Sequence, residues 1–434
     1  MRADLLDRMQ CPYCAGRLRL NRSFQEKGGS ILTGIVGCPC STYPVLEGIL
    51  VLRPPVDRRY LADLLEKGRA DQATYIVMSN RDPQLLRLVV AVGHGSRFRR
   101  LSLAPAAAYL IAEGRRRHEW VRRDVPFFQL LGNSPFENYL KHRFAAETLW
   151  LAYAVMPLVG ARDGVTLELG CGAGHASYLL GSHSDARELI CTDHSFWALY
   201  LARKYMAPEA SFIQLDSNFP LPFRNNTIDC IFGLDALHYV EAKKTISEEM
   251  KRVLRPKGLL LLLHLHNALQ HNPSPGFPLA PQAWVELFRD FSPRAIADRR
   301  IIDNLLTRDQ LDLRRSSFDE GLNAAPAMSI IASEEPTVFE LHEQIREQQF
   351  AVSKNLRLNS VYRRLKRRNG VAVREFPTDS FAAEFPLSAT YLPERIPAGQ
   401  PIEGNAATLS ATTREAALTM FKKFILVDLP PRYM

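Results

Sequence analysis

Three closely spaced glycines follow an acidic residue in the middle of the chain, in the order Glu168-Leu-Gly170-Cys-Gly172-Ala-Gly174. An apolar run precedes the glycines and a helical pattern follows them. Such a loop presents backbone N–H groups at a helix N-terminus, and its glycines let a ligand approach the backbone closely. A dinucleotide-binding loop has the spacing GxGxxG, and here His175 stands where that pattern needs its third glycine. The loop therefore predicts a nucleotide-like ligand other than a dinucleotide.

Carboxylates end the next two expected strands along the chain. Ile190-Cys-Thr-Asp193 places one about twenty residues beyond the loop, where it can accept hydrogen bonds from both hydroxyls of a ribose. Phe212-Ile-Gln-Leu-Asp216 ends the following strand with another. We expect both carboxylates to belong to the same nucleoside site as the glycine loop.

Four of the seven cysteines lie in the first forty residues, namely Cys11, Cys14, Cys38 and Cys40. Four thiolates from two turns can form a tetrahedral zinc site, and a module of about 50 residues has too small a core to be stable without such a site. The second pair has the spacing C-x-C instead of the usual C-x-x-C, so a metal-free module with reduced, buried cysteines is the alternative. The odd number of cysteines argues against a disulfide framework.

Hydrophobic patterning predicts the elements that position these residues. Short apolar runs separated by helical segments are typical of a parallel βαβ sheet, with strands expected at 165–169, 189–193, 211–215, 228–232, 258–264 and 327–332. We expect a helix at Thr245–Leu254 and one long charged helix at Thr337–Arg368. The chain divides into a small β module (1–54), a basic helical linker region (55–135), the sheet domain (136–333) and a C-terminal extension (334–434).

The ordered motifs of residues 136–333 resemble the type 11 domain of class I S-adenosylmethionine-dependent methyltransferases. Leu237-His238-Tyr-Val240 and Arg255-Pro-Lys-Gly258 take part in this resemblance. It implies an α/β, Rossmann-like sheet with helices on both faces, and a carboxylate at Glu168 that holds the ammonium group of the ligand. The implied S-adenosylmethionine contacts are Glu168, Gly170, Cys171, Gly172, Gly174, Asp193, His194, Asp216, Ser217 and Leu234. Cys171 is assigned no chemistry of its own.

Histidines supply the candidate proton acceptors. Methyl transfer is an in-line displacement that depends mainly on alignment and desolvation, and a base is needed only when the nucleophile must lose a proton. We predict His238, just after the fourth strand, as the catalytic base. His264 and His266 are further candidates, since residues two apart share one face of a strand. A purely structural role is the alternative for each of them.

Residues 5–52 resemble a small zinc-ribbon-like family, the activator subunit shared by tRNA, rRNA and protein methyltransferases. The opening Leu5-Leu-Asp-Arg-Met-Gln-Cys-Pro-Tyr-Cys14 and the ending Tyr43-Pro-Val-Leu-Glu-Gly-Ile49 carry this resemblance. It implies that the chain contains in cis what elsewhere is a separate partner, which covers apolar surface or helps to position the substrate. A stabilising cap is the alternative interpretation.

The formal net charge of +9 comes from the first third of the chain, residues 1–135. Arginine clusters between Arg97 and Arg123 can meet an anionic partner such as RNA, or can simply form a solvated helix face. The 46% hydrophobic and 23% charged residues are typical of a soluble globular protein. No apolar run approaches the roughly 20 residues of a membrane helix. We therefore expect a cytoplasmic protein without a membrane span.

Together these features predict an S-adenosylmethionine-dependent methyltransferase that acts on an O, N or C nucleophile of a small-molecule or carrier-attached acceptor. RNA or a ribosome-associated protein is the alternative acceptor. A non-catalytic scaffold that retains the fold is an alternative of another class. The C-terminal extension fits three roles, a substrate lid, a homo-oligomerisation arm or a docking segment for a protein partner.

Overall fold

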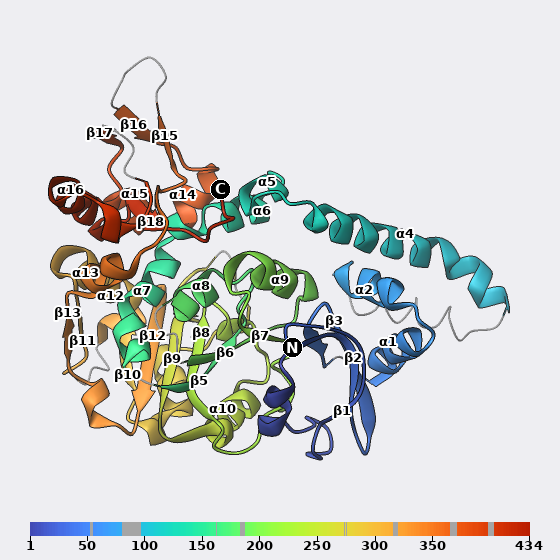
Figure 1. Ribbon diagram of the computed structural model, residues 1–434. Coiled ribbons are helices and arrows are strands. Elements are labelled where there is room, and N and C mark those ends of the chain that lie inside the picture. Colours follow the sequence, from blue (N-terminus) through green and yellow to red (C-terminus); the bar gives the residue numbers. More distant parts are fainter. Residues whose placement is uncertain are drawn as a thin grey trace.

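The computed structural model describes residues 1–52, 55–79, 97–161, 163–182, 187–272, 274, 276–315, 320–364, 371–397 and 403–434. Within these residues the largest sheet has eleven strands and passes through the middle of the molecule (Figure 1). Its strand order is β1-β2-β3-β4-β7-β6-β5-β8-β9-β12-β10.

The centre of this sheet is parallel, as the apolar runs predicted. Five parallel strands form it, in the order β7 (Ser211–Gln214), β6 (Arg187–Asp193), β5 (Gly164–Leu169), β8 (Ile228–Leu234) and β9 (Leu254–His266). Two antiparallel strands complete one edge, first β12 (Ala327–Ser333) and then β10 (Arg294–Ala297). The sequence analysis predicted β12 but not β10. The strand order reverses at β5, and ligands of open α/β sheets bind outside the carboxyl ends of the strands at such a reversal.

Helices cover both faces of the sheet, which confirms the predicted α/β class. One face packs against α7 (Glu147–Gly160), α8 (His175–Ser182), α9 (Phe196–Leu201) with the π-turn Ala202–Met206, and α12 (Asp298–Arg308). The other face packs against α10 (Lys243–Val253) and α11 (Pro281–Leu287), followed by a 3-10 turn at Arg289–Phe291. The helix expected at 245–254 is thus α10, shifted by one to two residues. Helix α7 is apolar on all sides because it lies between the sheet and the C-terminal extension.

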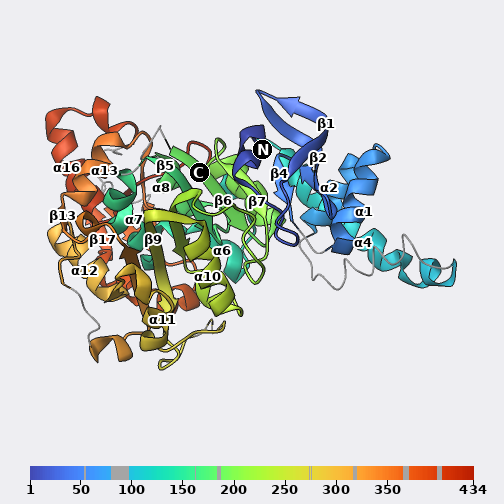
Figure 2. The same ribbon diagram turned by 90° about the horizontal axis from the view of Figure 1, so that it is seen from below.

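The N-terminal strands continue the central sheet. After the 3-10 helix Ala3–Arg8, four antiparallel strands follow: β1 (Arg19–Lys27), β2 (Ser30–Cys38), β3 (Ser41–Leu46) and β4 (Ile49–Val51). Strand β4 pairs in parallel with β7, with Ile49 opposite Phe212 and Val51 opposite Gln214. Figure 2 shows the N-terminal strands at the β7 side of the sheet. They therefore cover an edge that would otherwise expose unpaired backbone groups.

The predicted linker region is helical in its described parts. Its helices are α1 (Pro55–Glu66), α2 (Ala70–Met78), α4 (Arg97–Arg122) and α5 (Phe127–Leu130), followed by α6 (Pro135–Lys141) and the 3-10 turn Arg143–Ala145. Helix α4 is the long helix that projects to one side in Figure 1. It approaches α2 so closely that a Cβ on Gly114 would lie 1.7 Å from the carbonyl oxygen of Tyr75. Only glycine fits this crossing.

The predicted single helix at 337–368 is wrong. The segment forms a 3-10 turn (Pro336–Val338), β13 (Leu341–Glu343), α13 (Ile345–Val352), β14 (Leu356–Leu358) and β15 (Tyr362–Arg364), and residues 365–370 lie outside the described residues. Strand β13 pairs with β11 (Gln310–Asp312), and β14 pairs with β18 (Leu426–Asp428). Asp428 Oδ1 accepts hydrogen bonds from the N–H groups of Lys354 and Asn355 just after α13. These distant partners override the local helical pattern.

Several parts of the C-terminal extension contact α7. Its elements are β16 (Val371–Arg374), α14 (Asp379–Glu384), α15 (Pro386–Tyr391), β17 (Arg395–Pro397), the 3-10 turn Ala406–Thr408, and α16 (Ala411–Lys422); a further 3-10 turn, Glu320–Asn323, precedes β12. Arg346 on α13 is fully buried, and its guanidinium contacts the rings of Tyr153 on α7 and of Phe421 and Phe424. The extension is therefore part of the main core.

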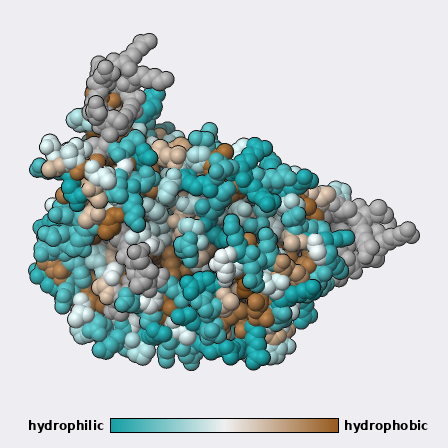
Figure 3. Space-filling model, viewed as in Figure 1, coloured by the Kyte–Doolittle hydropathy of each residue, from teal (hydrophilic) through white to brown (hydrophobic). Residues whose placement is uncertain are grey.

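The visible surface is mainly hydrophilic, with small, separate hydrophobic clusters (Figure 3). Among the described helices, none combines the length and the apolar character that crossing a bilayer requires.

Candidate functional site

A cavity of about 1520 Å³ opens at the carboxyl ends of the central strands. Its wall includes the loops that follow β5, β6, β7 and β8, the end of β9, helix α6, and the α14–α15 segment of the C-terminal extension. This is the edge at which the strand order reverses. Every residue predicted to contact S-adenosylmethionine lines the cavity except Gly174.

The three loop glycines have different surroundings. All three have positive φ angles, +70° at Gly170, +54° at Gly172 and +88° at Gly174. A Cβ on Gly170 would lie 2.5 Å from Cβ of Ala236, and one on Gly174 would lie 2.6 Å from Cβ of Ala202. A Cβ on Gly172 would meet no atom within 4 Å. Gly170 and Gly174 therefore permit close packing, whereas Gly172 leaves open space at the cavity wall for a ligand.

Glu168 lies at the floor of the cavity and is only 2% exposed. Ser177 on α8 donates a hydrogen bond to its Oε2. Burial raises the pKa of Glu168 to about 7, and the hydrogen bond from Ser177 opposes this shift. A cationic ligand group beside Glu168 would favour the ionised carboxylate.

Asp193 and Asp216 lie on the same wall as the glycine loop. Asp193 Oδ2 accepts a hydrogen bond of 2.9 Å from the N–H of Gly172, and Oδ1 accepts one of 2.8 Å from the N–H of Ser195. Asp216 Oδ1 accepts from the backbone and side-chain nitrogens of Asn218. Each carboxylate oxygen can accept more than one hydrogen bond, so both residues retain capacity for ligand hydroxyls or amines.

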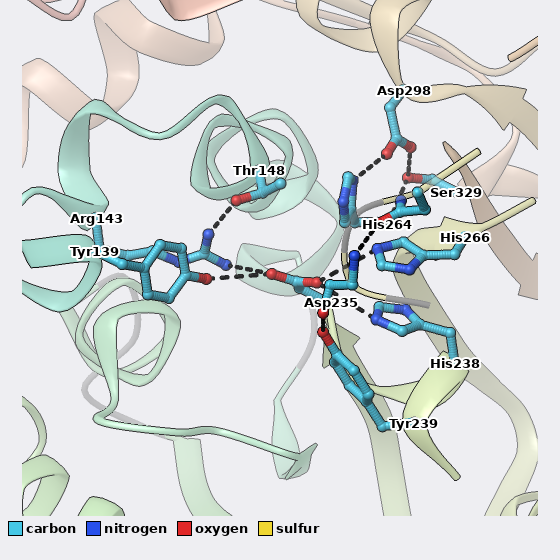
Figure 4. Close-up of polar contacts among 12 residues, drawn as sticks. Tyr139, Arg143, Thr148, Asp235, His238, Tyr239, His264, His266, Asp298 and Ser329 are labelled. Carbon is cyan, nitrogen blue, oxygen red and sulfur yellow. Dashed lines mark hydrogen bonds and ion pairs between the residues drawn. The ribbon is translucent and has the colours of Figure 1, made fainter. Parts of the chain in front are cut away.

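Three histidines gather at the ends of β8 and β9 (Figure 4). The rings of His238 and His266 are stacked with their centroids 3.4 Å apart, and the His264 ring lies 5.2 Å from that of His266. His264 and His266 line the cavity, but the predicted base His238 is completely buried behind them. Burial lowers the pKa of His238 to about 3 and that of His266 to about 4, so both imidazoles are neutral.

Asp235, which the sequence analysis did not single out, lies between these histidines and α6. Its Oδ2 accepts hydrogen bonds from the hydroxyl of Tyr139 at 3.2 Å and from Nη2 of Arg143 at 3.4 Å. Burial favours the neutral acid, but His264 and Arg143 hold the pKa of Asp235 below its usual value. A carboxylate directly after β8, three residues before His238, was the signal available in the sequence.

His264 differs from its two neighbours because it has a carboxylate partner. Its Nδ1 lies 2.8 Å from Oδ2 of Asp298, and Ser329 donates a hydrogen bond to Oδ1 of Asp298. Burial opposes the charged ring, but the bond to Asp298 and the charge of Asp235 raise the pKa of His264. His264 has a φ of +57° where the pairing of β9 with β12 is irregular, and its Nδ1 faces Asp298 at the start of α12.

The C-terminal extension forms one wall of the cavity through Phe381, Glu384, Phe385 and Leu387. Glu147 on α7 fixes this wall, since its Oε2 accepts hydrogen bonds from the N–H groups of Leu387 and Ser388. Burial raises the pKa of Glu147 to about 7, and these hydrogen bonds oppose the shift. The sequence carried no local sign of this contact, because the partners are 240 residues apart.

The four N-terminal cysteines converge. Their sulfur atoms lie within 4.8 Å of one another, with separations of 3.6 Å for Cys11–Cys40, 3.8 Å for Cys14–Cys38 and 3.4 Å for Cys38–Cys40. Tetrahedral zinc with bonds of about 2.3 Å places its sulfur ligands about 3.8 Å apart. The C-x-C spacing is therefore compatible with a four-sulfur site.

Several arginines of the basic region have acidic partners. On α4, Arg115 pairs with Glu119, and Arg117 pairs with Glu113. The side chains of the first arginine cluster, 97–100, lie outside the described residues. The described part of α4 thus has less unpaired positive charge than the sequence indicated.

The central part of the chain is similar to known proteins. Residues 167–262 match the family model of the methyltransferase domain. A stretch of 134 residues is 33% identical to a ubiquinone/menaquinone biosynthesis C-methyltransferase of Cellvibrio japonicus and covers 28% of this chain and 52% of that protein. Another of 93 residues is 31% identical to a probable phthiotriol/phenolphthiotriol dimycocerosates methyltransferase of Mycobacterium ulcerans and covers 21% of this chain and 36% of that one. The chain thus spans about half or less of these relatives.

Among solved structures, an S-adenosylmethionine-dependent methyltransferase from Aquifex aeolicus aligns over 46% of this chain and 93% of its own length. The sequence identity is 15% and the TM-score 0.32.

Proposed function

We propose that this protein is an enzyme that transfers a methyl group from S-adenosylmethionine to an O, N or C nucleophile of a small-molecule or carrier-attached acceptor. One observation carries the proposal. The open space at Gly172, the Glu168 carboxylate and the carboxylates of Asp193 and Asp216 share one cavity wall, within the segment that matches a methyltransferase domain.

The residues of this wall fit the proposed cofactor. Glu168 would hold its ammonium group, Asp193 the ribose hydroxyls, and Asp216 with Ser217 the adenine edge. Gly170, Cys171, Gly172, His194 and Leu234 would form the remaining contacts on the wall, while Gly174 would support the loop by packing against Ala202. When bound, S-adenosylmethionine supplies an electrophilic methyl group. The chain's own residues align the acceptor and exclude water from the cavity.

The apolar and aromatic part of the cavity lining favours a small acceptor over RNA. Aromatic side chains of α6 and of the C-terminal extension, including Tyr139, Phe381 and Phe385, line the same cavity as the glycine loop. The names of the two curated relatives also refer to small-molecule acceptors. The extension thereby forms a wall of the proposed acceptor pocket. Of the three roles named for it above, this is nearest to that of a substrate lid.

We propose that His238 assists the reaction through its neighbours. A general base works best when its pKa is near the working pH, and it must reach the proton that it removes. His238 has a pKa of about 3 and is screened from the cavity by His266 and Asp235. Any activation of the acceptor would therefore be delivered by the Asp235–His266 side of the cluster.

We also propose that Cys11, Cys14, Cys38 and Cys40 bind one Zn²⁺. The sulfur separations given above support this site. Its role would be to stabilise the N-terminal strands, which in turn hold β7 and the Asp216 that follows it.

Calorimetric titration of the full-length protein with S-adenosylmethionine, S-adenosylhomocysteine and NAD tests the cofactor proposal. We expect binding of the first two and none of NAD. Absence of binding to both adenosyl compounds would contradict the proposal. Methyl transfer to RNA but to no small molecule in a radiolabel assay with cell extract fractions would contradict the proposed acceptor class.

A further inference from the structure

The side chains of Asp235, His238 and His266 come together at the carboxyl ends of β8 and β9. Oδ1 of Asp235 lies 3.6 Å from Nε2 of His238 and 3.9 Å from Nε2 of His266. The three residues offer one ligand atom each within 4.8 Å of one another. Figure 4 shows the carboxylate directed at both stacked rings.

Three ring nitrogens of the two buried imidazoles make no hydrogen bond to the described residues. Among the described residues, neither ring nitrogen of His238 makes a hydrogen bond, nor does Nδ1 of His266. His238 is 0% exposed and His266 is 2% exposed. Buried polar groups in proteins are almost always satisfied, so these nitrogens require a partner, which a water molecule, a ligand or an ion can supply. Two adjacent rings of this kind that face a carboxylate suit a cation.

Surrounding residues orient the carboxylate for this role. Tyr139 and Arg143 both donate hydrogen bonds to Oδ2 of Asp235. The other oxygen, Oδ1, faces the two histidines. Partners of this kind commonly fix metal-ligating side chains. Asp235 also has a φ of +56°, a conformation that non-glycine residues adopt rarely and mainly at functional positions.

We propose that Asp235, His238 and His266 form a binding site for a divalent transition-metal ion of the Zn²⁺, Co²⁺ and Fe²⁺ class. Two ligand atoms each about 2.1 Å from one ion can be at most about 4.2 Å apart, and both measured separations are smaller than this. Two imidazoles with one carboxylate suit these ions, whereas Mg²⁺ and Ca²⁺ prefer oxygen ligands. His264 is not counted as a ligand, because the group of ligand atoms that lie within 4.8 Å of one another does not include it.

The proposed ion would face the acceptor. Asp235 and His266 line the cavity, so the remaining coordination positions of the ion open toward it. An oxygen or nitrogen of the acceptor could bind there and become easier to deprotonate. This role rests on the proposed function, whereas the metal site itself does not. It would explain how the buried His238 contributes without touching the acceptor.

Metal content of the full-length protein tests the site directly. The protein is stripped with a chelator, equilibrated with Zn²⁺ under reducing conditions, desalted, and measured by atomic emission. Asp235→Asn and His266→Gln should each lose the zinc equivalent of this site and keep that of the cysteine site, whereas Cys14→Ser should lose the equivalent of the cysteine site and keep this one. His271→Gln is the matched control, since His271 also lines the cavity but is exposed and lies outside the cluster. It should keep the full wild-type content.

Co²⁺ gives a second measurement. In a Cys14→Ser background, which disables the cysteine site, the visible absorption bands of bound Co²⁺ should persist, and they should disappear when His266→Gln is added. Circular dichroism and S-adenosylmethionine titration of each variant show whether it has folded. If folded Asp235→Asn and His266→Gln retain the wild-type zinc content, the proposed site is refuted. Refutation of the metal site would not affect the proposed cofactor binding. If the protein failed to bind the cofactor, its zinc content would still test the metal site.

Discussion

The backbone N–H of Gly172 donates a hydrogen bond of 2.9 Å to Oδ2 of Asp193. This bond ties the loop after β5 to the end of β6, so the floor of the cavity and the carboxylate proposed for the ribose are one unit. A change at either residue is therefore expected to affect the cofactor site as a whole.

Gly172→Ala should impair cofactor binding more than folding. The new Cβ meets no protein atom within 4 Å, and the φ of +54° costs an alanine roughly 1–2 kcal/mol. Because the methyl group would fill space left for the ligand, we expect the affinity for S-adenosylmethionine to fall at least tenfold by calorimetry. Unchanged affinity in a folded Gly172→Ala protein would show that the loop does not contact the ligand.

Gly174→Ala provides the contrasting variant. Its Cβ would lie 2.6 Å from Cβ of Ala202, and the φ is +88°. Both strain and overpacking apply, so we expect the free energy of unfolding to fall by about 3 kcal/mol or more. Urea denaturation monitored by circular dichroism measures this. A loss no larger than that of Gly172→Ala would mean that the contact between the loop and the turn after α9 is relaxed in solution.

The pKa of Glu168 makes the stability of the cofactor-free protein depend on pH. The folded-state pKa of about 7 exceeds the reference value of 4.5, so the folded state binds more protons between these pH values. The free energy of unfolding therefore falls as pH rises from 4.5 to 7, by up to about 3 kcal/mol from this group. Glu168→Gln should flatten that decline in denaturation curves, and an equally steep decline in the variant would contradict the assignment.

Cofactor binding should have the opposite dependence. Only the ionised Glu168 attracts the ammonium group, so we expect the affinity for S-adenosylmethionine to rise with pH through 7. The same titrations with Glu168→Gln should show weaker binding and little of this rise.

Glu147 should control how firmly the C-terminal wall is held. Glu147→Ala removes the acceptor for the N–H groups of Leu387 and Ser388, whereas Glu147→Gln keeps an amide oxygen in that place. We expect faster hydrogen exchange of residues 378–391 in the alanine variant and near wild-type exchange in the glutamine variant. Equal exchange in both variants would mean that aromatic packing alone holds this wall.

Cys14→Ser should remove one equivalent of zinc and lower thermal stability. Because β4 pairs with β7, we also expect weaker binding of S-adenosylmethionine than in the wild type. Cys230→Ala is a suitable control, since Cys230 lies inside β8, outside the N-terminal cluster. Wild-type metal content in Cys14→Ser would contradict the zinc site.

Much of the sheet could be predicted because its signals are local. A buried parallel strand is a short apolar run, and the residue that ends it is next to it in sequence, so β5, β6 and β7 were found with the carboxylates of Glu168, Asp193 and Asp216. Strand β8 was found without the Asp235 that follows it. The helix expected at 337–368 failed for the same reason. Its charged periodicity is a local signal, and pairing of β14 with β18 about 70 residues away overrides it.

The sequence by itself determined the α/β class, the glycine loop with its acidic companions and the cysteine spacing, because each depends on neighbours within a few residues. Only the tertiary structure decided that β4 extends the sheet, that α14 and α15 wall the cavity, and that Asp235 meets Tyr139, His238 and His266. Tyr139 and Asp235 are 96 positions apart. Contacts over such distances depend on how whole elements pack, which no local pattern encodes.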